Sequence, residues 1–248
     1  MTLPFDLGLG AALWLAFAAT GAAFVRGYSG FGYSAMVIAA SSLVTSPLNF
    51  VAVVVLLETA MSLQAARGAG PDVDWGRVGL MRAGAAVGLP LGLVVLTGVG
   101  EDTARAVISG YVLVMCGVLL AGWRLRVQVR GPGNLAAGVV SGMANAPGMG
   151  GLPIAAFFAA QPMPAVVFRA TLIAYFPLLD LYSAPLYWWA GLVSWDTLWA
   201  SLWLLPLSFF GNWLGGRHFF STDPQEFRRF AIALLAVLAS LGLVKVVL

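Results

Sequence analysis

The sequence predicts an all-α integral membrane protein of about eight hydrophobic helices in two related, inverted halves, each with a Gly-rich broken helix or re-entrant hairpin. Of its 248 residues, 60% are hydrophobic and only 9% are charged. A soluble domain carries about 25% charged residues, so lipid must be the solvent for much of this chain. Gly-rich segments at residues 27–32 (Gly-Tyr-Ser-Gly-Phe-Gly) and 141–151 interrupt apolar stretches about half a chain apart.

The first half contains apolar runs of two lengths. A membrane-spanning helix needs about 20 apolar residues. The shortest run, 33–44, predicts a half-helix or re-entrant arm, and 7–25 could either span or form the other arm. The remaining runs are long enough to span, and they are 48–66, 78–98 and 104–123.

The second half repeats this order. Runs 134–144 and 149–160 are too short to span alone and predict half-helices or re-entrant arms. The runs of spanning length are 164–190, 196–216 and 229–248. Trp75, Trp123, Trp195 and Trp199 lie near the predicted helix ends, as expected for aromatic belts at the membrane interfaces.

Short motifs that recur near the predicted helix ends and at helix prolines indicate an internal duplication. Pairs of similar motifs occur in the same order and at nearly the same separation, which argues against coincidence. The pairs are Ser46-Pro47 with Met163-Pro164, Asp74-Trp75 with Trp195-Asp196, Leu89-Pro90 with Leu205-Pro206, and residues 101–105 with 223–228. We therefore expect a first membrane repeat at 1–125, a basic cytoplasmic linker at 126–133 and a second membrane repeat at 134–248.

The distribution of basic residues favours inverted over parallel halves. If each half crosses the membrane four times, the basic residues divide almost evenly between the two sides. If each half is a re-entrant hairpin followed by three spans, all but Arg26, Arg105 and Lys245 of the 13 Lys and Arg residues are cytoplasmic. The second arrangement obeys the positive-inside rule far better.

The Gly-rich breaks are the expected substrate site of a transporter, because irregular backbone survives in lipid only where protein buries it or it lines a wet cavity. A helix N-terminus offers free N–H groups to an anion, and glycine allows close backbone approach. Alternatively, the glycines only permit tight helix packing. The residues expected to bind substrate are Arg26, Gly27, Tyr28, Ser29, Gly30, Gly32, Ser141, Asn145, Gly148, Gly150 and Gly151.

Arg26 adjoins the first break. An arginine at membrane depth costs at least about 2.5–3.5 kcal/mol, so it should face a cavity or a partner. Its planar fork suits a sulfonate or carboxylate. The alternative is a side chain that extends to the lipid headgroups, and for Arg169, the nearest analogue in the second half, this alternative is preferred.

Two carboxylates, Glu58 and Asp180, lie within apolar helices. Ionisable residues inside a membrane are rare and are functional candidates by default. Either carboxylate could carry a proton that is coupled to substrate movement, since a charged carboxylate near an anion site would repel the substrate. The alternative is a structural pairing, such as Glu58 with Arg26.

Motifs in both halves resemble those of the sulfite exporter TauE/SafE family, also called the 4-toluene sulfonate uptake permease family. In the first half these are residues 25–32, Ser46-Pro47 and the helix that carries Glu58. In the second half they are residues 142–151, Pro153, Pro162 and residues 169–171. The resemblance implies a multi-pass protein of the bacterial inner membrane with about eight helices. It also implies transport of sulfite, sulfonates, sulfoacetate or related organic anions, with export as the expected direction.

The expected function is therefore secondary transport of a small anion by alternating access. An anion channel, a membrane-embedded assembly subunit and a membrane enzyme are the alternatives. The sequence contains no nucleotide-binding or catalytic motif, and its single cysteine and single histidine predict no metal site. We expect no cofactor and no nucleic-acid partner. The lipid bilayer and a small anion are the expected partners, and the oligomeric state, including a homodimer, stays open.

Overall fold

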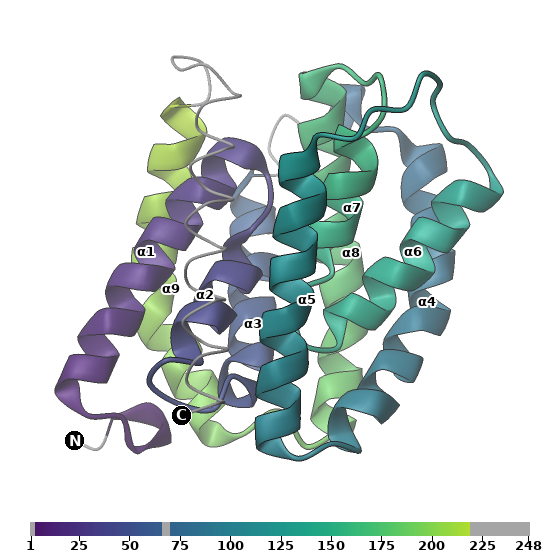
Figure 1. Ribbon diagram of the computed structural model, residues 1–248. Coiled ribbons are helices and arrows are strands. Elements are labelled where there is room, and N and C mark those ends of the chain that lie inside the picture. The colour runs from purple at the N-terminus through teal and green to yellow at the C-terminus, as the bar shows by residue number, and fades with distance from the viewer. Residues whose placement is uncertain (1–2, 66–69, 219–248) are drawn as a thin grey trace.

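The computed structural model describes residues 3–65 and 70–218, and its regular elements there are all helical (Figure 1). The helices are the 3₁₀ turns Pro4–Asp6 (η1) and Gly70–Asp72 (η2), and α1 Leu9–Ser29, α2 Tyr33–Ser41, α3 Leu48–Ala65, α4 Trp75–Thr97, α5 Glu101–Ala121, α6 Pro132–Asn145, α7 Gly151–Ala159, α8 Ala165–Trp189 and α9 Trp195–His218. Each apolar run expected before residue 218 corresponds to one α-helix. The expected span 229–248 and the repeat motif at 223–228 lie outside the described residues.

Four described helices, α1, α4, α5 and α8, are long and apolar enough to cross a membrane. The run at 7–25 therefore lies in a helix of spanning length. The runs 48–66 and 196–216 were also expected to span, but α3 counts only as a shorter apolar helix and α9 is not among the four.

Tryptophans occupy both ends of the helical bundle, as expected for aromatic belts. Trp75 begins α4 and Trp123 follows α5, whereas Trp195 begins α9 and lies near Trp189, the last residue of α8. All four side chains are exposed. In Figure 1 the start of α4 and the end of α5 are at the top, and the end of α8 and the start of α9 are at the bottom. The exposed indoles therefore mark two levels, one at each end.

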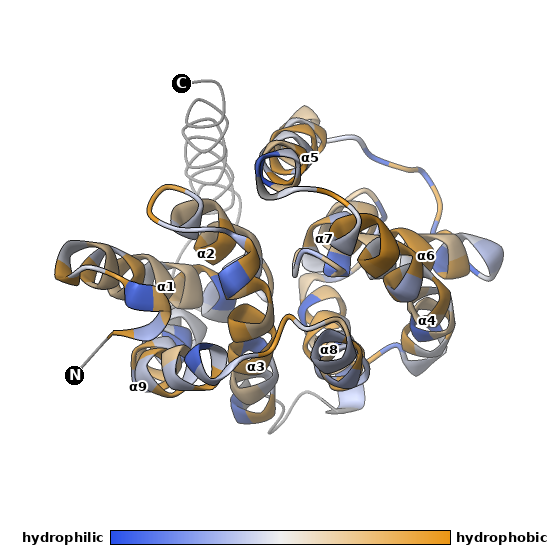
Figure 2. Ribbon diagram, turned by 90° about the horizontal axis from the view of Figure 1, so that it is seen from below, coloured by the Kyte–Doolittle hydropathy of each residue, from blue (hydrophilic) through white to orange (hydrophobic). Residues whose placement is uncertain are grey.

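The two halves exchange helices. Seen along the bundle, α1, α2, α3 and α9 form one group, and α4, α6, α7 and α8 form another (Figure 2). The groups meet where α3 packs against α8. The most extensive helix pairs are α1 with α9 and α4 with α6, so each group contains a helix from the other half of the chain.

Glycines bring the exchanged helices together. A Cβ atom at Gly88 on α4 would lie 2.1 Å from the carbonyl oxygen of Val139 on α6. A Cβ atom at Gly215 on α9 would lie 2.0 Å from the carbonyl oxygen of Phe24 on α1. Small residues allow this backbone contact in membranes, where apolar helices gain little by leaving lipid.

Both Gly-rich segments interrupt helices as expected. Between α1 and α2 the backbone passes through left-handed conformations at Gly30 (φ 85°) and Gly32 (φ 96°). Between α6 and α7 it does so at Gly148 (φ 75°). An L side chain is disfavoured in this region, so each reversal depends on glycine.

Corresponding helices of the two halves run in opposite directions in Figure 1. Helix α3 rises and α8 descends, while α4 descends and α9 rises. The α1–α2 hairpin begins and ends at the bottom, and the α6–α7 hairpin begins and ends at the top. The upper end therefore contains the start of α4, the linker after α5, the start of α8 and the end of α9, with their arginines.

The close glycine contacts predict a large difference between two positions on the same helix. Gly88→Ala should lower the free energy of unfolding by about 1–3 kcal/mol, because the new methyl group would overlap the α6 backbone. Gly79→Ala on α4 meets no atom within 4 Å and serves as the control. Thermal unfolding of both variants in the same detergent tests this. Equal melting temperatures would contradict the close α4–α6 contact.

Candidate functional site

The first break is held by side chains from both halves of the chain. The Gly30 N–H donates to the carbonyl oxygen of Arg26 (2.7 Å) and closes the end of α1. The Ser29 hydroxyl contacts the carbonyl oxygens of Val25 (2.8 Å) and Phe31 (3.0 Å). From α8, the Arg169 guanidinium donates to the carbonyl oxygen of Gly27 (3.0 Å). The Arg169 contact satisfies a carbonyl group near the end of the interrupted helix, where intrahelical donors run out.

Arg26 is buried, with 3% of its surface exposed, where α1, α3 and α9 meet. Its guanidinium donates to the Ser62 hydroxyl (2.5 Å) on α3 and to Oδ1 of Asn212 (3.3 Å) on α9. Its Nε lies 3.6 Å from Oε1 of Glu58. The structural pairing of Arg26 with Glu58, which the sequence left open, is therefore present.

Arg26 also lines a cavity of about 390 Å³ with two further arginines, Arg169 and Arg217. The guanidinium of Arg217 lies 4.4 Å from the centre of the Trp213 ring, in a cation–π contact. The described residues that line this cavity include no Asp or Glu; they are Arg26, Gly27, Gly30, Gln64, Arg169, Ile173, Asn212, Trp213, Gly216 and Arg217. We call it the arginine cavity.

The arrangement in the arginine cavity suits a small anion. Guanidinium groups bind carboxylate and sulfonate oxygens through paired N–H donors. Gln64 and Asn212 are hydrogen-bonded to each other, with Nδ2 of Asn212 2.9 Å from Oε1 of Gln64, and they add amide groups to the lining. With three cationic groups in the lining, an anion is the ligand that the local charge favours.

The location of Arg26 differs from the topology expectation, which assigned it to the side opposite Arg169 and Arg217. Helix α1 continues without interruption to Ser29. Arg26 therefore lies near the tip of the α1–α2 hairpin, not near its entrance, and reaches the same cavity as the other two arginines. Arg67, Arg228, Arg229 and Lys245, which entered the same charge count, lie outside the described residues.

Glu58, on α3, lies beside Ser34 at the amino end of α2 and interacts with it. The positive end of a helix dipole and Arg26 thus both face this buried carboxylate. In this structure, the N-terminus that was expected to bind an anion is in contact with an anionic side chain of the protein itself.

Asp180 is 1% exposed on α8, and it interacts electrostatically with Glu58 and Arg26. Within the described part of the chain, its Oδ2 atom has no hydrogen-bond partner. A buried carboxylate oxygen without a donor is costly when charged, so this group is a candidate for reversible protonation.

The second break is closed by hydrogen bonds within the break and to side chains of α8. The Ser141 hydroxyl donates to the carbonyl oxygen of Gly150 (2.8 Å) and accepts from the Tyr175 hydroxyl (3.0 Å). Nδ2 of Asn145 donates to the Ser183 hydroxyl (2.8 Å), and the Tyr187 hydroxyl donates to the Asn145 carbonyl oxygen. The two side chains that were expected to face a ligand are thus bonded to protein atoms.

The structure separates the expected site residues into groups. Arg26, Gly27 and Gly30 line the arginine cavity. Tyr28 is buried where α1 meets α9, and Ser29 and Gly32 belong to the first reversal. The remaining residues lie in the second break, where Gly148 is packed against Ile38 and Val54, Gly150 against Ser141 and Asn145, and Gly151 against Phe176.

Sequence reasoning did not assign Gln64, Asn212 or Arg217 to a site. A signal was present for two of them, because residues 211–217 (Gly-Asn-Trp-Leu-Gly-Gly-Arg) combine glycine and polar residues at the end of an apolar helix. Gln64 carried no comparable signal. Among the described residues, no group of three or more His, Cys, Asp and Glu side chains could hold a metal ion.

Comparison with known proteins gives one match. A family model described as "Sulfite exporter TauE/SafE" matches residues 15–241, which cover all the helices described above except η1 and the first turns of α1. No curated protein and no solved structure matches the chain.

Proposed function

The chain belongs to the sulfite exporter TauE/SafE family of membrane transport proteins, and from this premise we propose that it is a secondary transporter that exports a small sulfur-containing or organic anion. Sulfite, sulfonates and sulfoacetate are the proposed substrate class. The observation that carries the proposal is the arginine cavity, where Arg26, Arg169 and Arg217 converge beside a broken helix.

The position of the arginine cavity supports access from the cytoplasm. It is lined by the last turns of α1 and α9 and the first turns of α8, which lie at the upper end in Figure 1. That end also carries the basic linker after α5, and arginine-rich loops are typical of the cytoplasmic side. An anion from the cytoplasm would therefore meet the exposed Arg217 before the buried Arg26, which lies beside Glu58.

Removing single arginines tests the proposed anion site. Arg26→Ala and Arg169→Ala should each weaken the binding of sulfite or sulfoacetate to purified protein at least about tenfold, because a hydrogen bond to a charged group contributes about 1.5–3 kcal/mol. Isothermal titration would measure the affinities. Arg82→Ala, which removes an exposed arginine from α4, is the matched control and should leave affinity unchanged.

Asn145→Ala tests whether the anion site consists of the arginine cavity alone or also includes the second break. If the second break also contributes to the site in another state of the transport cycle, Asn145→Ala should weaken binding as well, although its amide is bonded to Ser183 here. Unchanged affinity in both arginine variants would place the substrate elsewhere.

We further propose that the halves are inverted repeats with a common origin. The exchanged pairs α1–α9 and α4–α6 are the contacts that a two-fold relation between the halves requires, and α3 and α8 would meet on its axis. Side-chain contacts repeat as well. Arg26 is bonded to Ser62 and Asn145 to Ser183, while Glu58 and Asp180 occupy comparable helices. Each pair of equivalent residues is about 120 residues apart.

Single cysteines test the inverted arrangement. With Cys116 replaced by alanine, Arg124→Cys and Arg217→Cys should react with a membrane-impermeant maleimide from the cytoplasmic side. Asp102→Cys and Asp196→Cys, at the starts of α5 and α9, should react only from the other side. Labelling of intact cells and of inverted vesicles would compare the two faces. Labelling of residues 124 and 217 from opposite sides of the membrane would exclude inverted halves.

Glu58 and Asp180 are the proposed proton-coupling residues. They interact with each other and with Arg26, so protonation of either carboxylate would change the charge that an anion in the arginine cavity encounters. Protonation would favour anion entry by removing a repulsive charge, which couples the two movements.

Neutral isosteres test the coupling. Asp180→Asn keeps the size of the side chain and removes its protonation, so proton-gradient-driven anion accumulation in liposomes should fall to background. Anion exchange without a gradient should persist, which checks that the variant folds and binds. Glu58→Gln provides the second position. Gradient-driven accumulation that survives in the double variant would remove both carboxylates from the mechanism.

A further inference from the structure

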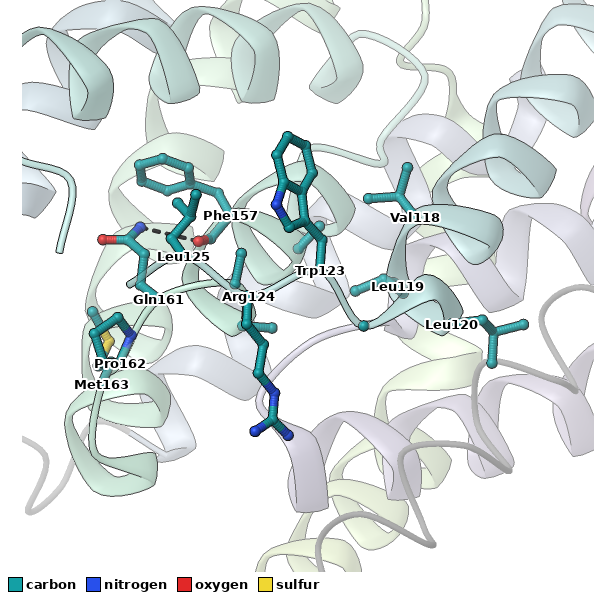
Figure 3. A pocket seen from close by; sticks show the side chains of 14 residues that line it. Val118, Leu119, Leu120, Trp123, Arg124, Leu125, Phe157, Gln161, Pro162 and Met163 are labelled. Carbon is teal, nitrogen blue, oxygen red and sulfur yellow. Dashed lines mark hydrogen bonds between the residues drawn. The ribbon is translucent and has the colours of Figure 1, made fainter. Parts of the chain in front are cut away.

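A second cavity, of about 710 Å³, lies between the ends of α5 and α7 and is separate from the arginine cavity. In Figure 3, Val118 and Leu119 of α5 stand on one side, and Phe157 of α7 stands on the other with Gln161 and Pro162 of the following turn. Trp123 and Arg124 lie between the two sides. We call this space the α5–α7 groove.

The walls of the α5–α7 groove are apolar and open. Val118, Leu120 and Trp123 are 43%, 54% and 72% exposed. Among the described helices, α5 packs sparsely on α7 and α2, whereas α1 and α4 pack extensively on their partners, and in Figure 2 it stands apart from the α4–α6–α7–α8 group. Because α5 is of membrane-spanning length and composition, we place these walls beside the acyl chains of the bilayer.

The mouth of the groove is basic. Residues 123–130 (Trp-Arg-Leu-Arg-Val-Gln-Val-Arg) contain three arginines and no acidic residue. Arg124, Arg126 and Arg130 are all exposed. A cationic segment at the end of an apolar groove matches the two parts of an anionic lipid, a charged headgroup and acyl chains.

Hydrogen bonds fix this basic segment against the other wall of the groove. The Leu125 N–H donates to the carbonyl oxygen of Ala160 (2.6 Å), and Nε2 of Gln128 donates to that of Pro162 (2.9 Å). The buried Arg77 of α4 donates to the side chains of both Gln128 (2.9 Å) and Gln161 (3.0 Å). The linker is therefore held in place, and Arg124 is presented at a defined level beside the exposed Trp123 indole.

We propose that the α5–α7 groove binds one anionic phospholipid of the cytoplasmic leaflet, with an acyl chain along Val118, Leu119 and Phe157 and the phosphate on Arg124. A second copy of this chain is a poorer occupant, because two arginine-rich mouths would repel each other. A soluble phosphate would leave the apolar walls unused. The proposal does not depend on which anion is transported.

Quenching of Trp123 by brominated lipids tests the proposal in the full-length protein. The protein is reconstituted in phosphatidylcholine vesicles that contain a minor fraction of lipid with brominated acyl chains, either phosphatidylglycerol or phosphatidylcholine. Subtracting the signal of Trp123→Phe isolates this one of the nine tryptophans. The expected result is about fivefold enrichment of phosphatidylglycerol around Trp123, since one arginine near a membrane surface favours an anionic lipid by that factor.

Three variants and one competitor make the outcome decisive. Arg124→Ala should abolish the preference for phosphatidylglycerol, whereas Arg82→Ala should retain it. Ala159→Phe, which fills the groove without adding charge, should reduce quenching by both lipids. Equal quenching of the unaltered protein by the two lipids would overturn the proposal. Loss of the preference for phosphatidylglycerol in the presence of soluble glycerol phosphate would also overturn it. So would a dimer in native mass spectrometry, if neither brominated lipid quenched Trp123.

Discussion

The structure depends on one constraint, which is that broken helices inside a membrane must have their backbone groups satisfied by protein. At the first break, Arg169 from the other half reaches the Gly27 carbonyl oxygen. At the second, Tyr187 of α8 reaches the Asn145 carbonyl oxygen. Helix α8 supplies both donors and must therefore lie directly against both breaks. This explains why α3 and α8 occupy the centre, and why the outer pairs α1–α9 and α4–α6 approach closely enough to require glycine.

The two breaks share a scaffold but differ in chemistry. Where the first has Arg26 bonded to Ser62, the second has the neutral Asn145 bonded to Ser183. A buried arginine requires acceptors and a counter-charge, and Ser62, Asn212 and Glu58 supply them at the first break. An asparagine needs far less, and the second break is closed by Ser141, Tyr175 and Tyr187. The described arginines are thus concentrated at the first break rather than at the second.

Glu58 links this charge to the protein interior. It lies between Arg26 and the amino end of α2, so two sources of positive potential hold one carboxylate. An incoming anion would compete with Glu58 for Arg26. Because Asp180 interacts with both groups from α8, the charge states of these residues are coupled across the interface between the halves. Such coupling across a helix interface is the physical basis on which ion-coupled transport can depend.

The sequence by itself determined the membrane class, the order of helices up to α9, the two breaks at Gly30 and Gly148, and the presence of the isolated charges Arg26 and Glu58 in apolar helices. These features follow from local composition, because apolar length, glycine and isolated charges have the same meaning wherever the chain places them. Only the tertiary structure decided which residues share a cavity. Asn212 and Arg217 join Arg26 because α9 packs on α1, and Gln64 joins them from α3, bonded to Asn212. A contact between residues as far apart in the chain as Arg26 and Asn212 leaves no local pattern. The packing of α8 set Arg169 on the Gly27 carbonyl oxygen and placed Ser183 and Tyr187 against Asn145 in the second break.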